Sequence, residues 1–406
     1  MITSNKFTLE EIGSFRKDTD GCQHVIHLNN AGAGLMPNVV TQSMIEHIKL
    51  EAQIGGYEAS ALKLDAINEF YAQAAKLFNC KPTNIAFGSS ATDSFSRALS
   101  SIPFEPGDVI LTDNDDFVSN QIQFLSLRKR LGVRIERIKN SVEGGVDLND
   151  VEQKLFQFKP RLFAITHIPT NSGLVQPALQ IGKIYKDYSD KNPERTWYIL
   201  DGCQSVGQMR LDVLELKCDF LSVTGRKWLR GPRGTGILYV SDRVLQAGLE
   251  PMFVDMRGAE WTSRDEYKQV ADAKRYEDWE FAYATVIGTR HAIEYCLRIG
   301  EEKISKRIKL LADITRNELS QIPKVSVLDK GPDLCGLVTF HVKGSDPRFI
   351  VGELLKRKIN VVPSYRAFAV LDFDEKGVEW AVRASAHYYN TEEEIEIFVR
   401  ELKAIL

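Results

Sequence analysis

The chain has 406 residues, of which 43% are hydrophobic and 26% charged, and its formal net charge is -3. This composition is typical of a globular protein, and a chain of this length usually forms one large domain and a smaller one. The slightly acidic balance argues against nucleic acid or an anionic membrane as partner, and no apolar run could span a bilayer.

Six cysteines are scattered along the sequence, with no Cys-x-x-Cys pair and no histidine cluster beside them. They are Cys22, Cys80, Cys203, Cys218, Cys296 and Cys335. We therefore predict free, mostly buried thiols and neither a disulfide framework nor a metal site. Reduced thiols are typical of the cytoplasm, and we predict a cytoplasmic protein.

Short apolar runs alternate with amphipathic stretches between about residues 60 and 240. The apolar runs predict strands at 84–87, 108–112, 161–167, 196–200, 220–224 and 236–240. The amphipathic spacing predicts helices at 93–100, 118–131, 147–158 and 179–188. This alternation indicates a mostly parallel sheet with helices on both faces, and polar residues past the carboxyl ends of its strands should meet in one crevice.

The pattern changes after residue 270. It predicts helices at 274–299, 301–321 and 390–406 and strands at 325–328, 337–342, 358–362 and 378–383. Thr391 and Glu394 have the spacing of a capping box at the start of the last helix. We predict a large domain at 21–270, a smaller α+β domain at 271–406, and an N-terminal segment, 1–20, that packs on the small domain. Residues 248–272 fit neither pattern, and a long connection of this kind is often functional.

Two of the predicted strands end in charged residues. One runs into Asp201, whose carboxylate is either a poorly solvated group that needs a cationic partner or a helix N-cap. The other delivers Thr224, Arg226 and Lys227. The hydroxyl and the guanidinium suit a phosphate, and a desolvated lysine beside an arginine becomes an amine nucleophile. The alternative is a surface basic cluster.

Two further strand ends carry small or amide side chains. Ala91 and Thr92 lie in a loop of small residues before a predicted helix, which indicates either an anion site at the helix N-terminus or an ordinary cap. Asn171, in Asn-Ser-Gly, either donates to an oxygen of a ligand or forms part of a turn. Each group is ambiguous alone, but all four lie at strand ends of one sheet pattern.

In this order the groups resemble those of fold-type I enzymes that use pyridoxal 5′-phosphate (PLP), specifically the class V aminotransferase and cysteine desulfurase family. The resemblance runs from about Leu28 to the C-terminus and is strongest in Asp201-Gly-Cys-Gln204, 222–227 and 231–240. It implies an α/β fold-type I PLP-dependent transferase, with a mostly parallel sheet flanked by helices and a smaller α+β domain. It also implies PLP as cofactor and a homodimer with active sites near the interface.

The resemblance assigns a role to each of these residues. Lys227 would hold PLP as a Schiff base and then move the Cα proton of the substrate, while Asp201 would keep the pyridine nitrogen protonated. The remaining implied cofactor contacts are Gln204 and Asn171 at the ring hydroxyl, Ala91, Thr92, Thr224 and Arg226 at the phosphate, and Phe117 stacked on the ring. Arg226 replaces a histidine usual in the family. Phe117 stands where desulfurases have histidine and cannot transfer a proton; the alternative for Phe117 is a core aromatic.

Further positions are implied for the substrate and the dimer. Arg383 stands just before a predicted helix start, where relatives bind the substrate carboxylate, and a guanidinium binds carboxylates bidentately. Asn29 and Asn30 resemble the N-terminal segment that lines the substrate pocket. Residues 275–280 resemble the stretch that approaches the active site of the other subunit in family dimers.

The main departure from the family concerns sulfur. Cysteine desulfurases carry a catalytic cysteine on a loop that follows the strand predicted here at 358–362, but this chain continues Ser364-Tyr-Arg366 and has no cysteine after Cys335. Arg366 instead suggests a pocket wall for a larger amino-acid substrate. Relatives without the loop cysteine include C–S lyases. We therefore predict a lyase that cleaves the Cβ–S bond of a cysteine conjugate or sulfoxide and releases pyruvate and ammonia.

Other activities stay open from the sequence. An aminotransferase and an amino-acid epimerase begin with the same removal of the Cα proton. A non-catalytic PLP-fold binding protein is disfavoured because the lysine, the aspartate and the phosphate residues are all present.

Overall fold

The structure is a computed structural model that describes residues 6–193 and 195–406. In these residues, a seven-stranded sheet and the helices packed on it form the larger part of the molecule, called here the larger layer. Its order is β2-β8-β7-β6-β5-β3-β4, and only β8 runs antiparallel to its neighbours. The strands are β2 (Ile85–Gly88), β3 (Val109–Thr112), β4 (Arg134–Arg137), β5 (Leu162–Thr166), β6 (Trp197–Asp201), β7 (Phe220–Thr224) and β8 (Gly236–Val240). The predicted mostly parallel sheet is confirmed.

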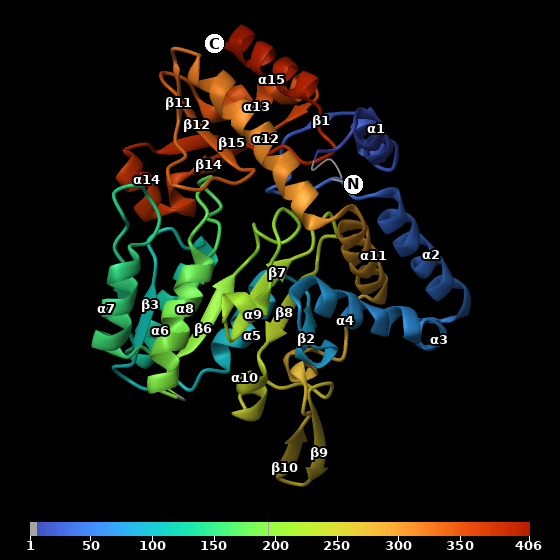
Figure 1. Cartoon of the computed structure of the whole chain (residues 1–406). Helices are drawn as coiled ribbons and strands as arrows, with labels where there is room; N and C mark the ends of the chain where they lie inside the picture. Colours follow the sequence, from blue (N-terminus) through green and yellow to red (C-terminus); the bar gives the residue numbers. More distant parts are fainter. Residues whose placement is uncertain (1–5, 194) are drawn as a thin grey trace, which may run out of the picture.

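Apart from the edge strand β4, the sheet is buried on both faces, as its apolar strands require. Leu200 and Leu221 belong to one apolar cluster, whereas Ile199 and Phe220 belong to another, because successive strand residues point to opposite faces. Helices before, between and after the strands surround the sheet, and all of them except α3 contribute residues to these clusters (Figure 1). They are α2 (Asn38–Ile54), α3 (Gly56–Leu62), α4 (Leu64–Phe78), α5 (Ala91–Ser100), α6 (Val118–Leu131), α7 (Leu148–Phe158), α8 (Ala178–Lys191), α9 (Val213–Leu216) and α10 (Asp242–Gln246).

The smaller layer is built on an antiparallel sheet of order β11-β12-β15-β14. Its strands are β11 (Val325–Val327), β12 (Val338–Val342), β14 (Val362–Tyr365) and β15 (Trp380–Ala384), and its helices are α12 (Glu301–Ser320), α13 (Pro347–Lys356), α14 (Val370–Lys376) and α15 (Glu392–Ile405). Thr391 and Glu394 form the predicted capping box at the start of α15. In Figure 1 this layer lies above the large sheet.

The N-terminal region contacts the smaller layer. The strand β1 (Ile26–His27) pairs in parallel with β13 (Ile359–Asn360). In α1 (Leu9–Lys17), Arg16 forms an ion pair with Glu394 at 2.9 Å. Residues 1–5 of the predicted N-terminal segment lie outside the described residues.

The helix predicted at 274–299 is wrong over its first part, because α11 spans only Tyr283–Ile299. The fully buried carboxylate of Glu277 accepts hydrogen bonds from the Phe87 backbone nitrogen at 2.7 Å and from the Tyr71 hydroxyl at 2.9 Å, and it pairs with Arg257. A short 3-10 helix, Ala273–Tyr276, lies beside β2 and ends at Glu277, whose backbone is extended, so these contacts keep the α-helix from starting here. The helix α11 lies after the predicted domain boundary at 270/271, but it packs on α2 and α4, which come before that boundary, and shares their apolar cluster. The position of the boundary therefore stays a prediction.

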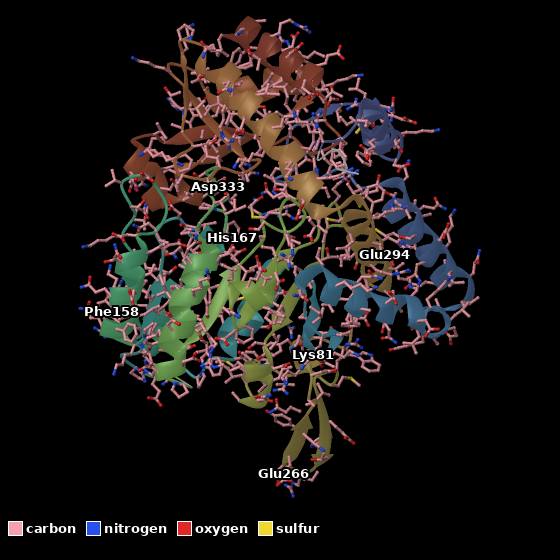
Figure 2. All side chains as sticks on the ribbon, in the orientation of Figure 1. Lys81, Phe158, His167, Glu266, Glu294 and Asp333 are labelled. Carbon is pink, nitrogen blue, oxygen red and sulfur yellow. The ribbon has the colours of Figure 1, made fainter. Side chains whose placement is uncertain are left out.

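The segment that fitted neither pattern contains a hairpin, β9 (Ala259–Ser263) and β10 (Glu266–Gln269). It projects from the body of the molecule in Figure 1, and Figure 2 labels Glu266 at its tip. Within the two described ranges, no helix combines the length and apolar character needed to cross a bilayer.

Candidate active site

A polar cavity lies at the carboxyl edge of β5, β6 and β7, where the crevice was expected. Lining residues come from the ends of these strands, from the first turn of α5 and from the start of α6. Among them are the predicted cofactor residues Ala91, Thr92, Phe117, Asp201, Gln204, Thr224, Arg226 and Lys227. Residues more than a hundred positions apart in the sequence therefore face one site, and their individual roles stay predictions.

Lys227 is a buried amine in this cavity. Its Nζ atom lies 6.0 Å from the centroid of the Phe117 ring. Burial lowers the pKa of Lys227 to about 8, and the positive charges of Arg226 and Arg383 act in the same direction. A lysine with such a pKa is partly neutral near physiological pH, which makes it a competent nucleophile and base.

The carboxylate of Asp201 is held at both of its oxygen atoms. Oδ1 accepts a hydrogen bond from the backbone nitrogen of Cys203 at 2.9 Å, and Oδ2 accepts one from Nδ2 of Asn120 at 3.1 Å. Asn120 was not predicted as a site residue, although it also lines the cavity. Asn120 comes three positions after Phe117 at the start of a helix, and this spacing places two side chains on the same side of the helix. It could have indicated that Asn120 also faces the cavity.

The N-terminus of α5 forms another wall of the cavity. The first N–H groups of an α-helix have no acceptor within the helix, and here these include the groups of Ala91 and Thr92. A Cβ atom at Gly236 would lie 2.4 Å from the carbonyl of Ser90, so the glycine lets β8 approach this helix end. Thr224 and Arg226 lie on the same cavity. Their donors and charge suit an anion such as a phosphate.

The amide of Gln204 is anchored by its neighbours. Its Nε2 atom donates to the carbonyl of Ala31 at 3.0 Å, and its Oε1 atom accepts from Nε1 of Trp228 at 2.8 Å. The side chain therefore has a fixed orientation at the cavity wall.

Asn171 does not line the cavity; its neighbour Thr170 does. The Ser364 hydroxyl donates to Oδ1 of Asn171, and Nδ2 of Asn171 donates to the carbonyl of Phe368 at 3.4 Å. Both partners belong to the smaller layer, so the amide is used in a contact between layers. The predicted contact with the ring hydroxyl has no support from this geometry.

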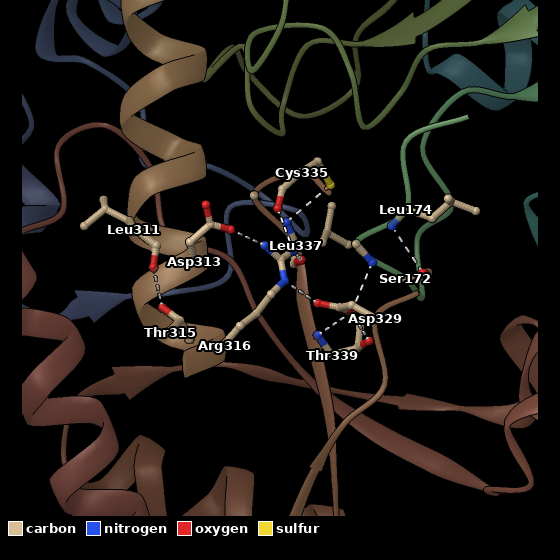
Figure 3. A network of polar contacts seen from close by, with 12 residues as sticks. Ser172, Leu174, Leu311, Asp313, Thr315, Arg316, Asp329, Cys335, Leu337 and Thr339 are labelled. Carbon is tan, nitrogen blue, oxygen red and sulfur yellow. Dashed lines mark hydrogen bonds and ion pairs between the residues drawn. The ribbon is translucent and has the colours of Figure 1, made fainter. Parts of the chain in front are cut away.

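A buried ion pair of the smaller layer holds the turn that follows Asn171 (Figure 3). Arg316 pairs with Asp329 at 2.8 Å, and Oδ1 of Asp329 accepts from the backbone nitrogen of Gly173 at 3.1 Å. A Cβ atom at Gly173 would lie 2.6 Å from Arg316 and 2.8 Å from the carbonyl of Leu337. Only glycine fits there without displacement.

Figure 2 labels His167, just past the end of β5, close to the smaller layer.

Arg383 reaches this turn from β15. Its Nη1 atom donates to the carbonyl of Thr170 at 3.0 Å, while its Nε atom is buried with no hydrogen-bond partner among the described residues. Burial lowers the pKa of Arg383 to about 10, and the charge of Arg226 adds to this effect. A buried guanidinium with an unpaired N–H group has capacity for a carboxylate.

The other predicted substrate residues lie elsewhere. Asn30 is fully buried; its Nδ2 donates to the carbonyl of Ser385 at 2.8 Å and its Oδ1 accepts from the Tyr389 hydroxyl at 2.5 Å, so it joins the N-terminal segment to the smaller layer. Asn29 is half-buried beside it and does not line the cavity. Arg366 lies at the surface and pairs with Asp374 at 2.8 Å, which occupies the guanidinium predicted to contact substrate.

The donor set of the cavity fits PLP. An anion can bind at the α5 N-terminus with Thr224 and Arg226, and Asp201 offers a carboxylate for a protonated ring nitrogen. The buried amine of Lys227 is available for the aldehyde, and the Phe117 ring offers a stacking surface.

Known proteins resemble this chain over nearly its whole length. A probable cysteine desulfurase of Pyrococcus abyssi is 29% identical over 400 residues, which cover 96% of each protein. The apo structure of a cysteine desulfurase from Thermococcus onnurineus has a TM-score of 0.86 and 28% identity, and the match covers 97% of both chains. A cystine C–S lyase, solved with its reaction product cysteine persulfide, has a TM-score of 0.83 at 23% identity and covers 95% of this chain and 99% of its own; at this identity the likeness shows the fold alone.

The sequence model of the aminotransferase class-V family matches residues 26–398. The fold-type I architecture and the PLP cofactor implied by the sequence are thereby confirmed. The chain belongs to the class V aminotransferase family of PLP-dependent enzymes.

Proposed function

We propose that this enzyme is a lyase that cleaves the Cβ–S bond of a cysteine conjugate or cysteine sulfoxide, with release of pyruvate and ammonia. The observation that carries the proposal is the lack of a thiolate where a persulfide could form. The chain has no cysteine after Cys335, and residues 364–376, which run from the end of β14 through α14, contain none.

The cysteines that are present do not replace that thiolate. Cys203 is the single cysteine among the residues that line the described cavity, and burial raises the pKa of its thiol well above the usual range. Burial also raises the pKa of Cys22 to about 11 and that of Cys335 to about 12. Because the thiolate is the nucleophile in persulfide formation, these thiols are poor acceptors of sulfur near neutral pH.

The residues of the cavity suit an elimination, together with Arg383, which binds the carbonyl of the lining residue Thr170. When bound, PLP supplies an electron sink that stabilises negative charge at the substrate Cα atom. Lys227 takes the Cα proton, since its lowered pKa makes a neutral amine available. Arg383 binds the α-carboxylate through its unpaired N–H group. The Cα–H and Cβ–S bonds break, a thiol leaves from a conjugate or a sulfenic acid from a sulfoxide, and addition of water to the remaining carbon skeleton yields pyruvate and ammonia.

The names of the relatives point to cysteine as a second candidate substrate. The matches from Pyrococcus abyssi and Methanothermobacter thermautotrophicus are both called probable cysteine desulfurase. A desulfurase that works through an enzyme thiolate would need a cysteine that this chain lacks on the 364–376 segment. Elimination from a conjugate needs none.

A substrate panel tests the proposal. Purified enzyme with PLP is incubated with S-alkyl-cysteines, their sulfoxides, cystine, cysteine and other amino acids, each with and without an added 2-oxo acid. Pyruvate that forms from the sulfur compounds without a 2-oxo acid supports the lyase. Turnover that depends on the 2-oxo acid identifies an aminotransferase, and interconversion of L and D forms without cleavage identifies an epimerase; either result alone overturns the proposal.

Two variants serve as controls for the substrate panel. Lys227→Ala should abolish pyruvate formation. Cys203→Ala should retain it, because elimination requires no enzyme thiol, and loss of activity in a folded Cys203→Ala protein would argue for a persulfide route. The homodimer implied by the family resemblance is proposed here as well, and sedimentation of the holoenzyme measures it.

A further inference from the structure

Asn120, which lines the cavity, joins the buried carboxylates of Asp201 and Asp116. Its Nδ2 atom lies 3.1 Å from Oδ2 of Asp201 and 2.9 Å from Oδ1 of Asp116. All three residues are buried, with exposures of 3% for Asn120, 5% for Asp201 and 5% for Asp116. An ionised carboxylate only accepts hydrogen bonds, so the NH₂ end of the amide must face both acids, and each of its two hydrogens has one acceptor.

Asp116 is itself rigidly fixed. Its Oδ1 atom also accepts from the Phe117 backbone nitrogen at 2.7 Å and from the Thr166 hydroxyl at 2.5 Å. Its Oδ2 atom accepts from Nε2 of Gln121 at 2.8 Å and from the Thr112 hydroxyl at 3.2 Å. Burial raises the pKa of Asp116, and the charge of Asp201 adds to this, while the donors around both oxygens act in the opposite direction by favouring the ionised acid. Asp116 therefore gives the amide of Asn120 a stationary anchor.

The anchor determines the orientation of Asp201. The backbone of Cys203 holds one oxygen of Asp201 and Asn120 holds the other, so rotation of the carboxylate would break at least one of the two bonds. Each oxygen keeps a lone pair for a further donor. The negative charge of Asp116, one amide away, adds to the negative potential at Asp201 and favours a proton on any basic nitrogen that Asp201 contacts.

We propose that Asn120, anchored by Asp116, is a positioning residue that holds the Asp201 carboxylate so that it keeps the pyridine nitrogen of PLP protonated. This inference rests on the assignment of Asp201 to that nitrogen, and it is independent of whether the enzyme is a lyase. Asn120 itself need not touch the cofactor or the substrate.

The test compares Asn120→Ala with a matched control, Asn84→Ala. Asn84 is likewise buried at 3% exposure, and its Nδ2 atom also donates to two acceptors, the Val240 carbonyl and Asp242, both at 2.8 Å. Asn84 does not line the cavity. Both variants lose the two hydrogen bonds that a buried amide donates, and Asn84→Ala also loses the one that Oδ1 accepts from the Lys81 backbone nitrogen at 3.2 Å. A merely structural effect should therefore appear in both variants.

The readout is the ¹⁵N resonance of the pyridine nitrogen in holoenzyme prepared with ¹⁵N-labelled PLP, followed across pH. We expect the nitrogen of the unaltered enzyme and of Asn84→Ala to stay protonated to the same pH. In Asn120→Ala it should lose its proton at a pH lower by about one unit, which corresponds to the loss of one modest hydrogen-bond energy. The affinity of the apo protein for PLP, titrated by absorbance, should fall by about tenfold in Asn120→Ala only.

Three results would overturn the inference. One is an identical ¹⁵N titration in Asn120→Ala and the unaltered enzyme. Another is an equal shift in Asn84→Ala. The third is a neutral pyridine nitrogen in the unaltered enzyme, which removes the role of Asp201. Should Asn120→Ala fail to fold in a thermal unfolding assay, Asn120→Ser, which keeps a small polar side chain without reaching both acids, takes its place. A protonated nitrogen in an enzyme that cleaves no cysteine conjugate contradicts the lyase proposal and leaves this inference intact.

Discussion

The carboxylate of Asp329 accepts a hydrogen bond from the backbone nitrogen of Gly173 at 3.1 Å, and this contact ties the smaller layer to the turn after β5. The same turn contains Thr170, whose carbonyl is bound by Arg383. Asn171 adds the contacts with Ser364 and Phe368. The side of the cavity formed by this turn thus depends on residues far along the chain.

The first prediction concerns the ion pair of Arg316 and Asp329 that holds this turn, called here the clamp. The side chain of Asp329 has no solvent exposure, and that of its partner Arg316 is 10% exposed. Asp329→Ala removes the buried carboxylate and leaves the Arg316 guanidinium with only the half-exposed carboxylate of Asp313 at 3.2 Å. The free energy of unfolding should therefore fall by about 3–5 kcal/mol. Urea denaturation of the apo protein measures it. The control is Asp333→Ala, which breaks an exposed pair with Lys309 and should cost about 0–1 kcal/mol. Equal losses in the two variants would contradict the clamp.

A second prediction follows from the lowered pKa of Lys227. Since burial brings this pKa to about 8, the neutral amine accumulates as the pH rises through 8 rather than through the ordinary value of 10.5. The rate of covalent PLP capture by the apo protein should therefore rise about tenfold per pH unit below 8 and level off above it. Stopped-flow absorbance measures the rate, with Lys227→Ala as the blank. A rate that keeps rising to about pH 10 would show that the lysine is not desolvated.

A third prediction concerns Arg383. If its unpaired N–H group binds the substrate carboxylate, Arg383→Ala should raise KM by about tenfold to a hundredfold, the cost of a lost hydrogen bond between charged groups. Arg383→Lys keeps the charge without the fork and should fall in between. The affinity for PLP should change by less than about twofold, because Arg383 does not line the cofactor cavity. Steady-state kinetics and PLP titration measure the two effects, and an unchanged KM removes the assignment.

A fourth prediction concerns Asp201. Asp201→Ala should still bind PLP covalently through Lys227, but kcat should fall by about a hundredfold or more because the ring no longer holds a proton for charge stabilisation. Absorbance follows the bound cofactor and pyruvate release follows the rate. A kcat within about threefold of the unaltered enzyme would contradict the role of the carboxylate.

The fold could be predicted where local pattern decides structure. The strands β7 and β8 have the predicted bounds, and Thr391 caps α15 as its spacing indicated. The strand β4 was missed because it lies at the edge of the sheet and reads Arg-Ile-Glu-Arg, without the apolar run of a buried strand. The start of α11 was misplaced because the contacts of Glu277 with Tyr71 and Phe87 are long-range and have no local signal.

The site residues also differ in whether the local sequence predicts their position. The residues at strand ends, such as Asp201 and Lys227, could be placed from the sequence because parallel strands bring their carboxyl ends to one edge. Asn171 and Arg366 could not, because the direction of a side chain on a turn depends on its partners, here Ser364 and Asp374. Asn120 was missed because a polar residue on a helix usually faces solvent, and its spacing from Phe117 is the one local signal for a position at the cavity.

The most direct test of the account is a product balance on one cysteine conjugate that the enzyme turns over, with no 2-oxo acid present. Thiol, pyruvate and ammonia are quantified together over many turnovers, and the protein is examined for bound persulfide by mass spectrometry. We predict equal amounts of the three products and no sulfur on the enzyme. Alanine as the carbon product together with a persulfide on any of the six cysteines would contradict the account.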